Sequence, residues 1–352
     1  MAMKILISAL SGIGDALMFT PAISLIKKHF PEVSLEAVVM FKGVKDLYER
    51  LPELDKVYYL DFMNESKFKS LKFVLGLRAN NYDASINVYP SNRKEYNLIS
   101  FLIGAKKRAA AKYLRRDFSN LGWLNSVRVL ESDDTHNVET NIKLCSALFN
   151  LEIKELPPMN FPLTEEDTKN AENFLTKNSL KTSDYIIGMH PGCATLKNHI
   201  KRRWEPEKFS ELAKRLITEK NAKILIFGGP EEEELKKGVF ESIKDNNAFI
   251  VDTRNLAQSA ALIKQCKIFI TNDSSLMHVS SAMNVKTFAI IGPTNPGYIH
   301  PWKTEHKIIS LYLDCAPCFF YSPRPLICSR TDVQFKCIKE LTVEMVYNQI
   351  CS

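Results

Sequence analysis

The sequence predicts an α/β protein made of two doubly wound domains, each built around a parallel sheet. Its 352 residues are more than one hydrophobic core usually serves. Short apolar runs alternate with amphipathic segments, and this alternation stops once, at a stretch that contains prolines, before it resumes. Strands that are joined through helices run parallel, so the pattern favours two parallel sheets with helices on both faces.

The first half of the chain contains four predicted strands. Residues 4–10 form a short apolar run that ends in a glycine-containing loop, as buried strands do. An amphipathic segment follows to about Phe30, and Pro21 either kinks this helix or marks the start of its regular part. The other strands are expected over residues 34–39, 56–60 and 84–88, and a further helix over 93–103.

Residues 152–165 separate the two halves. They contain three prolines and no apolar periodicity, which is typical of a linker. We therefore place an N-terminal domain at residues 1–160 and a C-terminal domain at 161–340. The last helix, in residues 341–352, is expected to pack back toward the N-terminal domain.

Beyond the linker, strands and helices alternate again. Apolar runs predict strands over residues 185–189, 223–227, 248–251, 267–270 and 286–291. Helical spacing is found over residues 206–219, 231–243, 255–265, 275–283 and 341–350. Ligands of doubly wound sheets bind at the carboxyl ends of the strands, so every loop after a strand is a candidate site.

The composition is that of an ordinary globular protein, with 45% apolar and 25% charged residues. No apolar run reaches the ~18 residues of a membrane-spanning helix. The first apolar run imitates a signal peptide, but Asp15 and two glycines interrupt it and favour a strand, a loop and a helix. We therefore expect a cytoplasmic location.

Basic residues outnumber acidic ones by 47 to 40, which gives a formal net charge of +7 and supports an anionic partner. The excess is concentrated between residues 101 and 130, where Asp117 is the only acid. The basic residues there are Lys106, Lys107, Arg108, Lys112, Arg115, Arg116 and Arg128. A solvated loop explains this cluster, and so does a landing surface for a phosphorylated acceptor or an acidic membrane.

Eight cysteines in a cytoplasmic protein indicate thiols or metal ligands before disulfides. Four of them lie near the end of the chain, at Cys315, Cys318, Cys328 and Cys337. The first pair has the spacing of a zinc knuckle and the second pair does not. We expect reduced thiols, with a structural zinc site as the alternative.

The loop at residues 11–15 follows the first predicted strand and reads Ser-Gly-Ile-Gly-Asp. A dinucleotide fingerprint would need a glycine in place of Leu17 and an acid after the second strand, where residues 40–42 are Met-Phe-Lys. The two glycines are therefore expected to serve a tight turn and the close approach of another molecule. Asp15 is either a helix cap or, in such a loop, a general base.

Polar or glycine-bearing loops also follow strands in the second half. They are His190-Pro191-Gly192, Arg202-Arg203-Trp204 ahead of the next helix, Gly228-Gly229-Pro230 and Asn272-Asp273-Ser274-Ser275. The last one opens a helix, with His278 one turn along the same face. Backbone N–H groups, hydroxyls and a histidine at a helix start make a phosphate site. Taken singly, Asp273 or Ser274 is a plain N-cap and His278 a core residue, but together the loops favour a nucleotide site.

Several of these motifs, taken in their order along the chain, resemble those of a known protein family. They are Leu10-Ser11-Gly12-Ile13-Gly14-Asp15, Arg202-Arg203-Trp204, the segment from Asn272 to His278, Ile291-Gly292-Pro293-Thr294 and the late Cys-x-x-Cys. Over almost the full chain they resemble the ADP-heptose:lipopolysaccharide heptosyltransferases, glycosyltransferase family nine. The resemblance implies the GT-B fold of two Rossmann-like domains, with the donor bound by the second domain and the acceptor by the first.

The resemblance also implies residue roles. Asp15 matches the catalytic aspartate. The matches to the donor site are Thr195, Arg202, Glu231, Glu234, Asp273, Ser274, Ser275 and His278. Glu231 and Glu234 are alternative matches to one acid near the nucleoside. Arg202 replaces a lysine and keeps its charge, and Ser275 stands where many members have glycine. The acceptor is expected to meet the first loop and the basic cluster, at Gly12, Gly14, Lys106, Lys107, Arg108, Arg115 and Arg116.

We predict an inverting glycosyltransferase in which Asp15 takes the proton of the attacking hydroxyl. General base catalysis of this kind typically raises the reaction rate ~10²–10⁴-fold. Arg202 and the helix start at Ser274 would stabilise the departing diphosphate. No Asp-x-Asp motif occurs in the sequence, so an obligatory metal on the diphosphate is not expected. No cofactor is expected either, because the nucleotide sugar is a substrate. The resemblance implies a heptose from ADP-heptose and an acceptor hydroxyl in the lipopolysaccharide inner core.

The expected partners are a nucleotide-sugar donor and an anionic, lipid-linked saccharide acceptor, with peripheral contact at the inner face of the cytoplasmic membrane. Nucleic acid is not an expected partner. The alternatives are a nucleotide-sugar epimerase of the same architecture, a transferase that uses another nucleotide sugar, and a binding protein without turnover.

Overall fold

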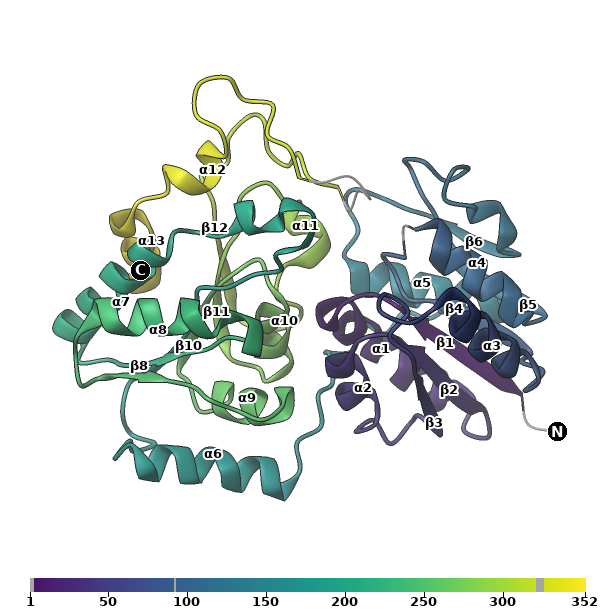
Figure 1. Ribbon diagram of the computed structural model, residues 1–352, viewed down its shortest axis with the longest axis horizontal. Helices are drawn as coiled ribbons and strands as arrows, with labels where there is room; N and C mark the ends of the chain where they lie inside the picture. Colours follow the sequence, from purple (N-terminus) through teal and green to yellow (C-terminus); the bar gives the residue numbers. More distant parts are fainter. Residues whose placement is uncertain (1–2, 92, 321–325) are drawn as a thin grey trace. The chain divides into compact units, whose positions relative to one another are not determined.

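The computed structural model describes residues 3–91, 93–320 and 326–352, and it divides into two compact units, Met1–Pro162 and Leu163–Ser352 (Figure 1). Each unit holds a six-stranded sheet in which all pairings are parallel. The strand orders are β3-β2-β1-β4-β5-β6 and β12-β11-β10-β7-β8-β9. The predicted class, two doubly wound α/β domains with parallel sheets, is confirmed.

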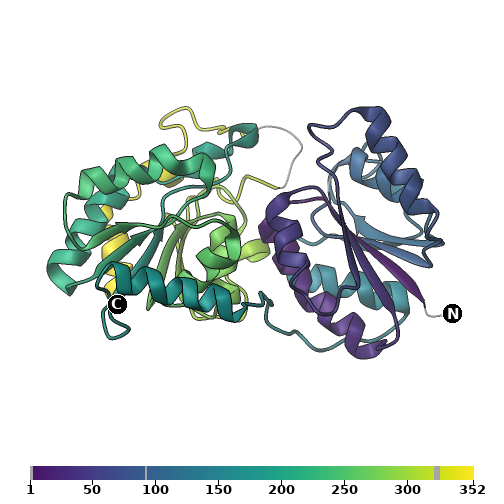
Figure 2. The same ribbon diagram turned by 60° about the horizontal axis from the view of Figure 1, so that its bottom comes forward.

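The strands of the first unit are β1 Lys4–Ala9, β2 Ser34–Val39, β3 Lys56–Tyr59, β4 Ala84–Asn87, β5 Lys107–Lys112 and β6 Val127–Leu130. Its helices are α1 Ile13–His29, α2 Lys42–Tyr48, α3 Lys67–Arg78, α4 Lys94–Ile103 and α5 Asn137–Phe149, with a 3₁₀ turn, η1, at Gly122–Leu124. Figure 2 shows α1 and α5 on one face of this sheet and α3 and α4 on the other. Both faces are thus covered, as a parallel sheet requires.

The strands of the second unit are β7 Ile186–His190, β8 Lys223–Ile226, β9 Ala248–Ile250, β10 Ile268–Asn272, β11 Lys286–Ile290 and β12 His306–Ile309. Its helices are α6 Glu165–Lys177, α7 Pro206–Lys220, α8 Glu233–Ile243, α9 Leu256–Ile263, α10 Ser275–Ala282, α11 Pro296–Ile299, α12 Lys336–Lys339 and α13 Val343–Cys351, with 3₁₀ turns η2 Leu196–Arg202 and η3 Pro230–Glu232.

The C-terminal helix α13 packs within the second unit, against α7 and β12. Val346 and Tyr347 are buried in the core that these elements share. The Tyr347 hydroxyl donates to Glu219 at 2.6 Å, and the Arg215 guanidinium lies 3.7 Å from the centre of the tyrosine ring. The apolar side of the helix is used here, which differs from the expected packing toward the N-terminal domain.

Pro21 lies inside α1, which begins at Ile13, so the interpretation that the regular helix starts after Thr20 is wrong. A proline inside a helix leaves the carbonyl four residues earlier without its N–H donor. Here the Thr20 hydroxyl donates to that carbonyl, the one of Leu17, at 2.8 Å. The helix therefore passes through the proline with its hydrogen bonding largely satisfied.

All eight cysteines are free thiols, and burial raises the pKa of Cys145 to about 12. Within the described ranges, no three His, Cys, Asp or Glu side chains gather in a group that could hold a metal ion. No helix in the described part of the chain combines the length and the apolar character needed to cross a membrane.

Candidate functional site

Asp15 lies in the first turn of α1, directly after β1 and at the carboxyl edge of the first sheet. β1 pairs with β2 on one side and β4 on the other, so this loop stands at the topological switch point of the sheet. The charge of Asp15 is felt by two tyrosines. Burial raises the pKa of Tyr48, and Asp15 raises it further. Burial also raises the pKa of Tyr96, with Arg93 opposing and Asp15 adding to the rise.

Gly12 caps α1 with φ −71° and ψ 175°, a backbone conformation that any residue adopts. A Cβ atom built at this position would have no atom within 4 Å. The turn therefore does not require a glycine here, contrary to one part of the sequence interpretation. The missing side chain instead leaves open space three residues before Asp15, and Gly14 follows within the helix itself.

The basic residues predicted to contact the acceptor lie at two opposite edges of the sheet. Lys107 begins β5 and pairs with Ala84 at the start of β4, which places Lys106, Lys107 and Arg108 at the amino edge. Arg108 is held there by donating to the carbonyl oxygens of Leu124 and Ala105. Arg115 and Arg116 follow the carboxyl end of β5. A strand of this length spans about 20 Å, so only these two arginines share an edge with Asp15.

In the second unit, Asp273 follows β10 and connects two neighbouring loops. Its Oδ2 atom accepts hydrogen bonds from Arg202, at the end of η2, at 2.5 Å and from the Thr294 hydroxyl, after β11, at 2.6 Å. All three side chains are buried. Arg202 lies over the Phe319 ring, 5.6 Å from its centre, and its buried Nε has no acceptor among the described residues. Asp273 thus holds the Arg202 guanidinium in place, and the Nε–H group of Arg202 remains available to donate a hydrogen bond.

His190, the last residue of β7, joins two further loops. Its Nδ1 lies 2.9 Å from the Ser274 hydroxyl and its Nε2 lies 2.9 Å from a carboxylate oxygen of Glu232. Ser274 is the N-cap residue of α10, yet its hydroxyl makes no cap hydrogen bond. It contacts His190 and Thr271 instead. The start of α10, including the half-buried Ser275, is therefore left without a side-chain cap.

Glu232 is the buried member of the run of four glutamates, whereas the predicted Glu231 and Glu234 are exposed. Burial alone would raise the pKa of Glu232. Hydrogen bonds from His190 and from the backbone N–H of Gly229, with the charges of His190 and Arg203, outweigh burial and lower that pKa. The acid held in the loop cluster is therefore Glu232, which lies between Glu231 and Glu234 in the sequence.

His278 lies one turn into α10 and is buried. Burial lowers the pKa of its imidazole to about 4, with Asp273 opposing and His300 adding to the shift, so the ring is neutral at pH 7. Its Nδ1 is buried and has no partner among the described residues. An unused polar atom inside a protein is costly, and this one lies within the segment predicted to hold the donor.

The remaining predicted residue, Thr195, is exposed at the start of η2. One residue that the sequence reasoning did not assign, Asn272, organises the region. Its side-chain oxygen accepts from the backbone N–H of Trp204 at 2.9 Å, and its amide donates to the carbonyl oxygen of Pro191 at 2.8 Å. Asn272 therefore ties two of the predicted loops to the end of β10.

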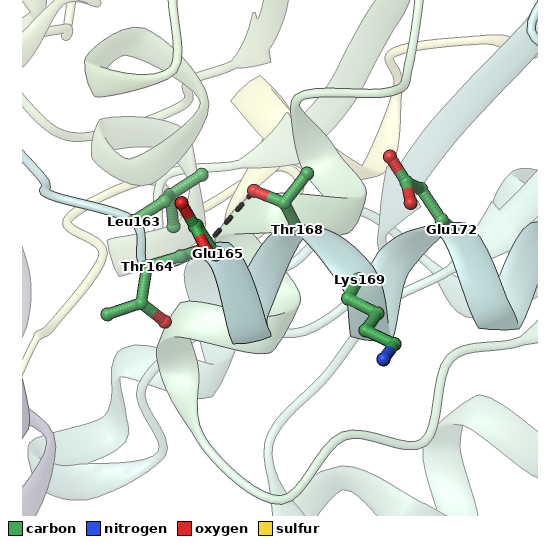
Figure 3. Close-up of a pocket in the computed structure, with 6 residues that line it drawn as sticks. All are labelled: Leu163, Thr164, Glu165, Thr168, Lys169 and Glu172. Carbon is green, nitrogen blue, oxygen red and sulfur yellow. Dashed lines mark hydrogen bonds between the residues drawn. The ribbon is translucent and has the colours of Figure 1, made fainter.

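A separate hollow lies on the first turns of α6 (Figure 3). Its lining residues are Leu163, Thr164, Glu165, Thr168, Lys169 and Glu172. They come from one helix start, where the Thr168 hydroxyl donates to the carbonyl oxygen of Thr164 at 3.2 Å. None of the predicted site residues lines this hollow, so the candidate donor site remains at the carboxyl edge of the second sheet.

The sequence profile of glycosyltransferase family 9 (heptosyltransferase) matches residues 70–324, which is most of the chain. The chain belongs to glycosyltransferase family 9. This family 9 member is 26% identical over 328 residues to lipooligosaccharide heptosyltransferase 2 of Haemophilus influenzae, covering 88% of this chain and 89% of that relative. It is 28% identical over 320 residues to lipopolysaccharide heptosyltransferase 2 of Escherichia coli, covering 88% of each chain.

Solved structures agree with the family 9 assignment in their fold. The structure of E. coli ADP-heptose lps heptosyltransferase II superimposes with a TM-score of 0.75 at 21% identity, over 99% of this chain and 98% of that one. E. coli heptosyltransferase WaaC with ADP gives a TM-score of 0.69 at 19% identity over 99% of both chains. The two doubly wound units of this family 9 chain thus form a GT-B fold, as the sequence motifs implied.

Proposed function

We propose that this family 9 enzyme is an inverting heptosyltransferase. It transfers a heptose from ADP-heptose to a hydroxyl of a lipopolysaccharide inner-core acceptor at the inner face of the cytoplasmic membrane. The names of the relatives supply the sugar and the acceptor class. The observation that carries the chemistry is the carboxylate of Asp15 at the switch point of the first sheet, next to the open space at Gly12.

The donor is assigned to the loops at the carboxyl edge of the second sheet. A diphosphate needs donors and positive charge, and the start of α10 supplies backbone N–H groups and the positive end of a helix dipole. Arg202 adds a fixed guanidinium whose Nε has no protein acceptor among the described residues. Neutral His278 offers a hydrogen bond rather than a charge. These groups support diphosphate binding better than any other part of the described chain.

The acid near the nucleoside remains assigned to Glu231 or Glu234. Glu232 is already held by His190 and the Gly229 N–H, so it positions the loop. Glu231 and Glu234 keep exposed carboxylates, and either of them can accept a hydrogen bond from a ribose hydroxyl. Thr195 stands at the start of η2, whose last residue is Arg202, and Ser275 follows Ser274, so both are assigned to the same donor site.

The proposed reaction is a single displacement. The acceptor hydroxyl loses its proton to Asp15 while its oxygen bonds to the anomeric carbon of the donor. The bond between that carbon and the phosphate oxygen breaks, and ADP leaves with the electron pair. Arg202 and the start of α10 stabilise the negative charge that grows on the diphosphate. A back-side attack of this kind inverts the anomeric configuration.

The acceptor is assigned to the first unit, with Gly12, Gly14, Arg115 and Arg116 beside Asp15 at the carboxyl edge. Lys106, Lys107 and Arg108 are withdrawn from this role because they lie at the amino edge. Filling the open space at Gly12 offers a direct test. Gly12→Val should block binding of the acceptor, and it should leave the backbone unstrained because φ at this position is ordinary.

Two measurements together test the function: which nucleotide sugar binds, and which product forms. In a thermal-shift panel of ADP-, GDP-, UDP- and dTDP-linked sugars, the true donor at ~100 times its dissociation constant adds ~2.7 kcal/mol of stability. ADP-heptose is expected to give this shift. Mass spectrometry of an inner-core acceptor incubated with enzyme and ADP-heptose should then show one added heptose. A shift with another nucleotide sugar, or release of free nucleotide without a glycosylated acceptor, would point to a different donor or to an epimerase.

A further inference from the structure

Helix α3 has two apolar faces, and only one of them is used by the fold. Val74 and Leu77 are buried against the sheet. On the opposite face, Phe68, Leu71 and Leu75 are 80%, 45% and 47% exposed. These positions are spaced at i, i+3 and i+7, so they form one stripe along the helix. A soluble helix normally carries polar residues along the centre of its outer face, and α3 carries Phe68, Leu71 and Leu75 there.

Basic side chains border the exposed stripe on both sides. The helix contains Lys67, Lys69, Lys72 and Arg78 and no acidic residue. In helical projection, Lys67 and Arg78 fall on one side of Phe68 and Lys72 and Lys69 on the other. Lys69 pairs with Glu65, but within the described ranges Lys67 and Lys72 form no ion pair.

The neighbouring helix α4 extends the apolar part of this pattern, and its first turn carries one base, Lys94, and one acid, Glu95. It packs beside α3 on the same face of the sheet (Figure 2). Arg78 of α3 donates to the carbonyl oxygen of Leu102, near the end of α4. Leu98 and Phe101 are each 44% exposed on the outer side of α4, with the Arg108 guanidinium 5.5 Å from the centre of the Phe101 ring. We call the exposed apolar and basic residues of α3 and α4 together the α3–α4 surface.

The α3–α4 surface begins at the edge of the sheet that carries Asp15. Both helices follow strands of a parallel sheet, so their first turns, with Phe68 and Lys94, lie at the carboxyl edge. Tyr96 in the first turn of α4 lies within reach of the Asp15 charge. A molecule held against this surface would therefore stand next to the proposed acceptor site.

We infer that the α3–α4 surface docks on an anionic lipid bilayer. An apolar stripe between rows of lysine and arginine, with no acid on the helix, matches lipid chains flanked by acidic headgroups. Twelve residues of helix span about 18 Å, too short to cross ~30 Å of hydrocarbon, so α3 lies in the interface. A second copy of this chain, whose net charge is also positive, lacks this charge complementarity. The inference extends the proposed function, because a lipid-anchored acceptor would be presented beside Asp15.

The test is co-sedimentation of the full chain with vesicles that contain no acceptor. Vesicles of phosphatidylethanolamine and phosphatidylglycerol should bind the protein, and pure phosphatidylcholine vesicles should bind it much less. Phe68→Ser removes a side chain whose burial is worth about 1.5–3 kcal/mol, so binding should weaken about tenfold or more. The pair Lys67→Gln and Lys72→Gln should weaken binding to the anionic vesicles by about 30-fold, at roughly 1 kcal/mol for each charge.

Ile327→Ser is the matched control, since Ile327 lies in the second unit and is 74% exposed, close to the 80% of Phe68. It should leave vesicle binding unchanged. All variants should keep their melting temperature and their turnover on a soluble acceptor fragment. No binding of the wild type to anionic vesicles, or binding that survives both α3 changes, would overturn the inference. So would a dimer that Phe68→Ser converts to a monomer. Vesicle binding without any transferase activity would sink the proposed function alone.

Discussion

At the scale of single residues, the proposed chemistry depends on one carboxylate. Asp15→Asn keeps the shape and hydrogen bonding of the side chain but cannot take a proton, so kcat should fall at least ~10²-fold. The affinity for ADP, measured by calorimetry, should barely change, because the proposed nucleotide contacts come from the other sheet. Asp46→Asn on α2 makes the same chemical change elsewhere in the unit and should be neutral. Near-normal turnover of Asp15→Asn would mean that another group is the base.

His278 makes a second residue-scale prediction, on stability against pH. Its pKa is about 4 when folded and near 6.5 when unfolded, so between these values the unfolded chain binds more protons. Stability should therefore fall as the pH drops through this window, by on the order of 2 kcal/mol at pH 5. Urea unfolding at pH 7 and pH 5 measures the loss. His278→Gln, which does not titrate, should lose that much less on acidification, and an equal loss in both proteins would refute the assignment.

At the scale of elements, β7, α8 and α10 are joined through His190. Removing one partner of a buried charged hydrogen bond costs about 3–5 kcal/mol, so His190→Ala should destabilise the protein by roughly this amount in urea unfolding. The double variant His190→Ala, Glu232→Gln should lose less unfolding free energy than the sum of the losses of the two single variants. The difference, the coupling energy, should be about 0.5–3 kcal/mol. Glu231→Gln and Glu234→Gln, on exposed neighbours, serve as controls and should stay within about 0.5 kcal/mol. Strict additivity would show that His190 and Glu232 do not act together.

The elements also show where sequence reasoning succeeds. Strands such as β1 and β8 are predicted because short apolar runs between turn residues have few other uses in a doubly wound protein. β5 was missed because its apolar part is three alanines between charged residues. Helix α6 was missed because prolines precede it and its exposed face is highly polar. Its one clear signal is the capping box of Thr164 and Asp167.

For the site, sequence reasoning identified the loops but not the partners within them. Asp15, Arg202, Asp273 and His278 stand out as charged or titratable residues after strands. Nothing in a run of four glutamates tells which one turns inward, because that depends on the 3₁₀ turn η3 and on the contact with His190. The prediction that the whole basic cluster contacts the acceptor fails for a similar reason. Lys106 and Arg115 are close in sequence, but β5 separates them by the length of a strand.

At the scale of the whole molecule, the attraction of an anionic acceptor depends on where the charges that make up the net charge of +7 lie. Arg115 is partly neutralised by a two-point contact with Asp133, whose oxygens lie 3.3 and 3.0 Å from its nitrogens. Arg116 is exposed, at a positive φ of 63°. These two cations are the basic pair that shares the carboxyl edge with Asp15, so a soluble anionic acceptor should feel them before the pair Lys106 and Lys107.

The last prediction compares these two pairs. Exposed charges are screened over ~8 Å at physiological salt, so added salt should raise KM for a soluble inner-core acceptor far more than KM for the donor. Changing Arg115 and Arg116 to Gln should raise the acceptor KM at low salt and flatten its salt dependence. The matched control changes Lys106 and Lys107 to Gln, which removes the same charge from the opposite edge and should alter neither constant. If the two double variants raise the acceptor KM equally, net charge attracts the acceptor and the carboxyl edge has no special part. If neither does, the arginines belong to an ordinary solvated loop.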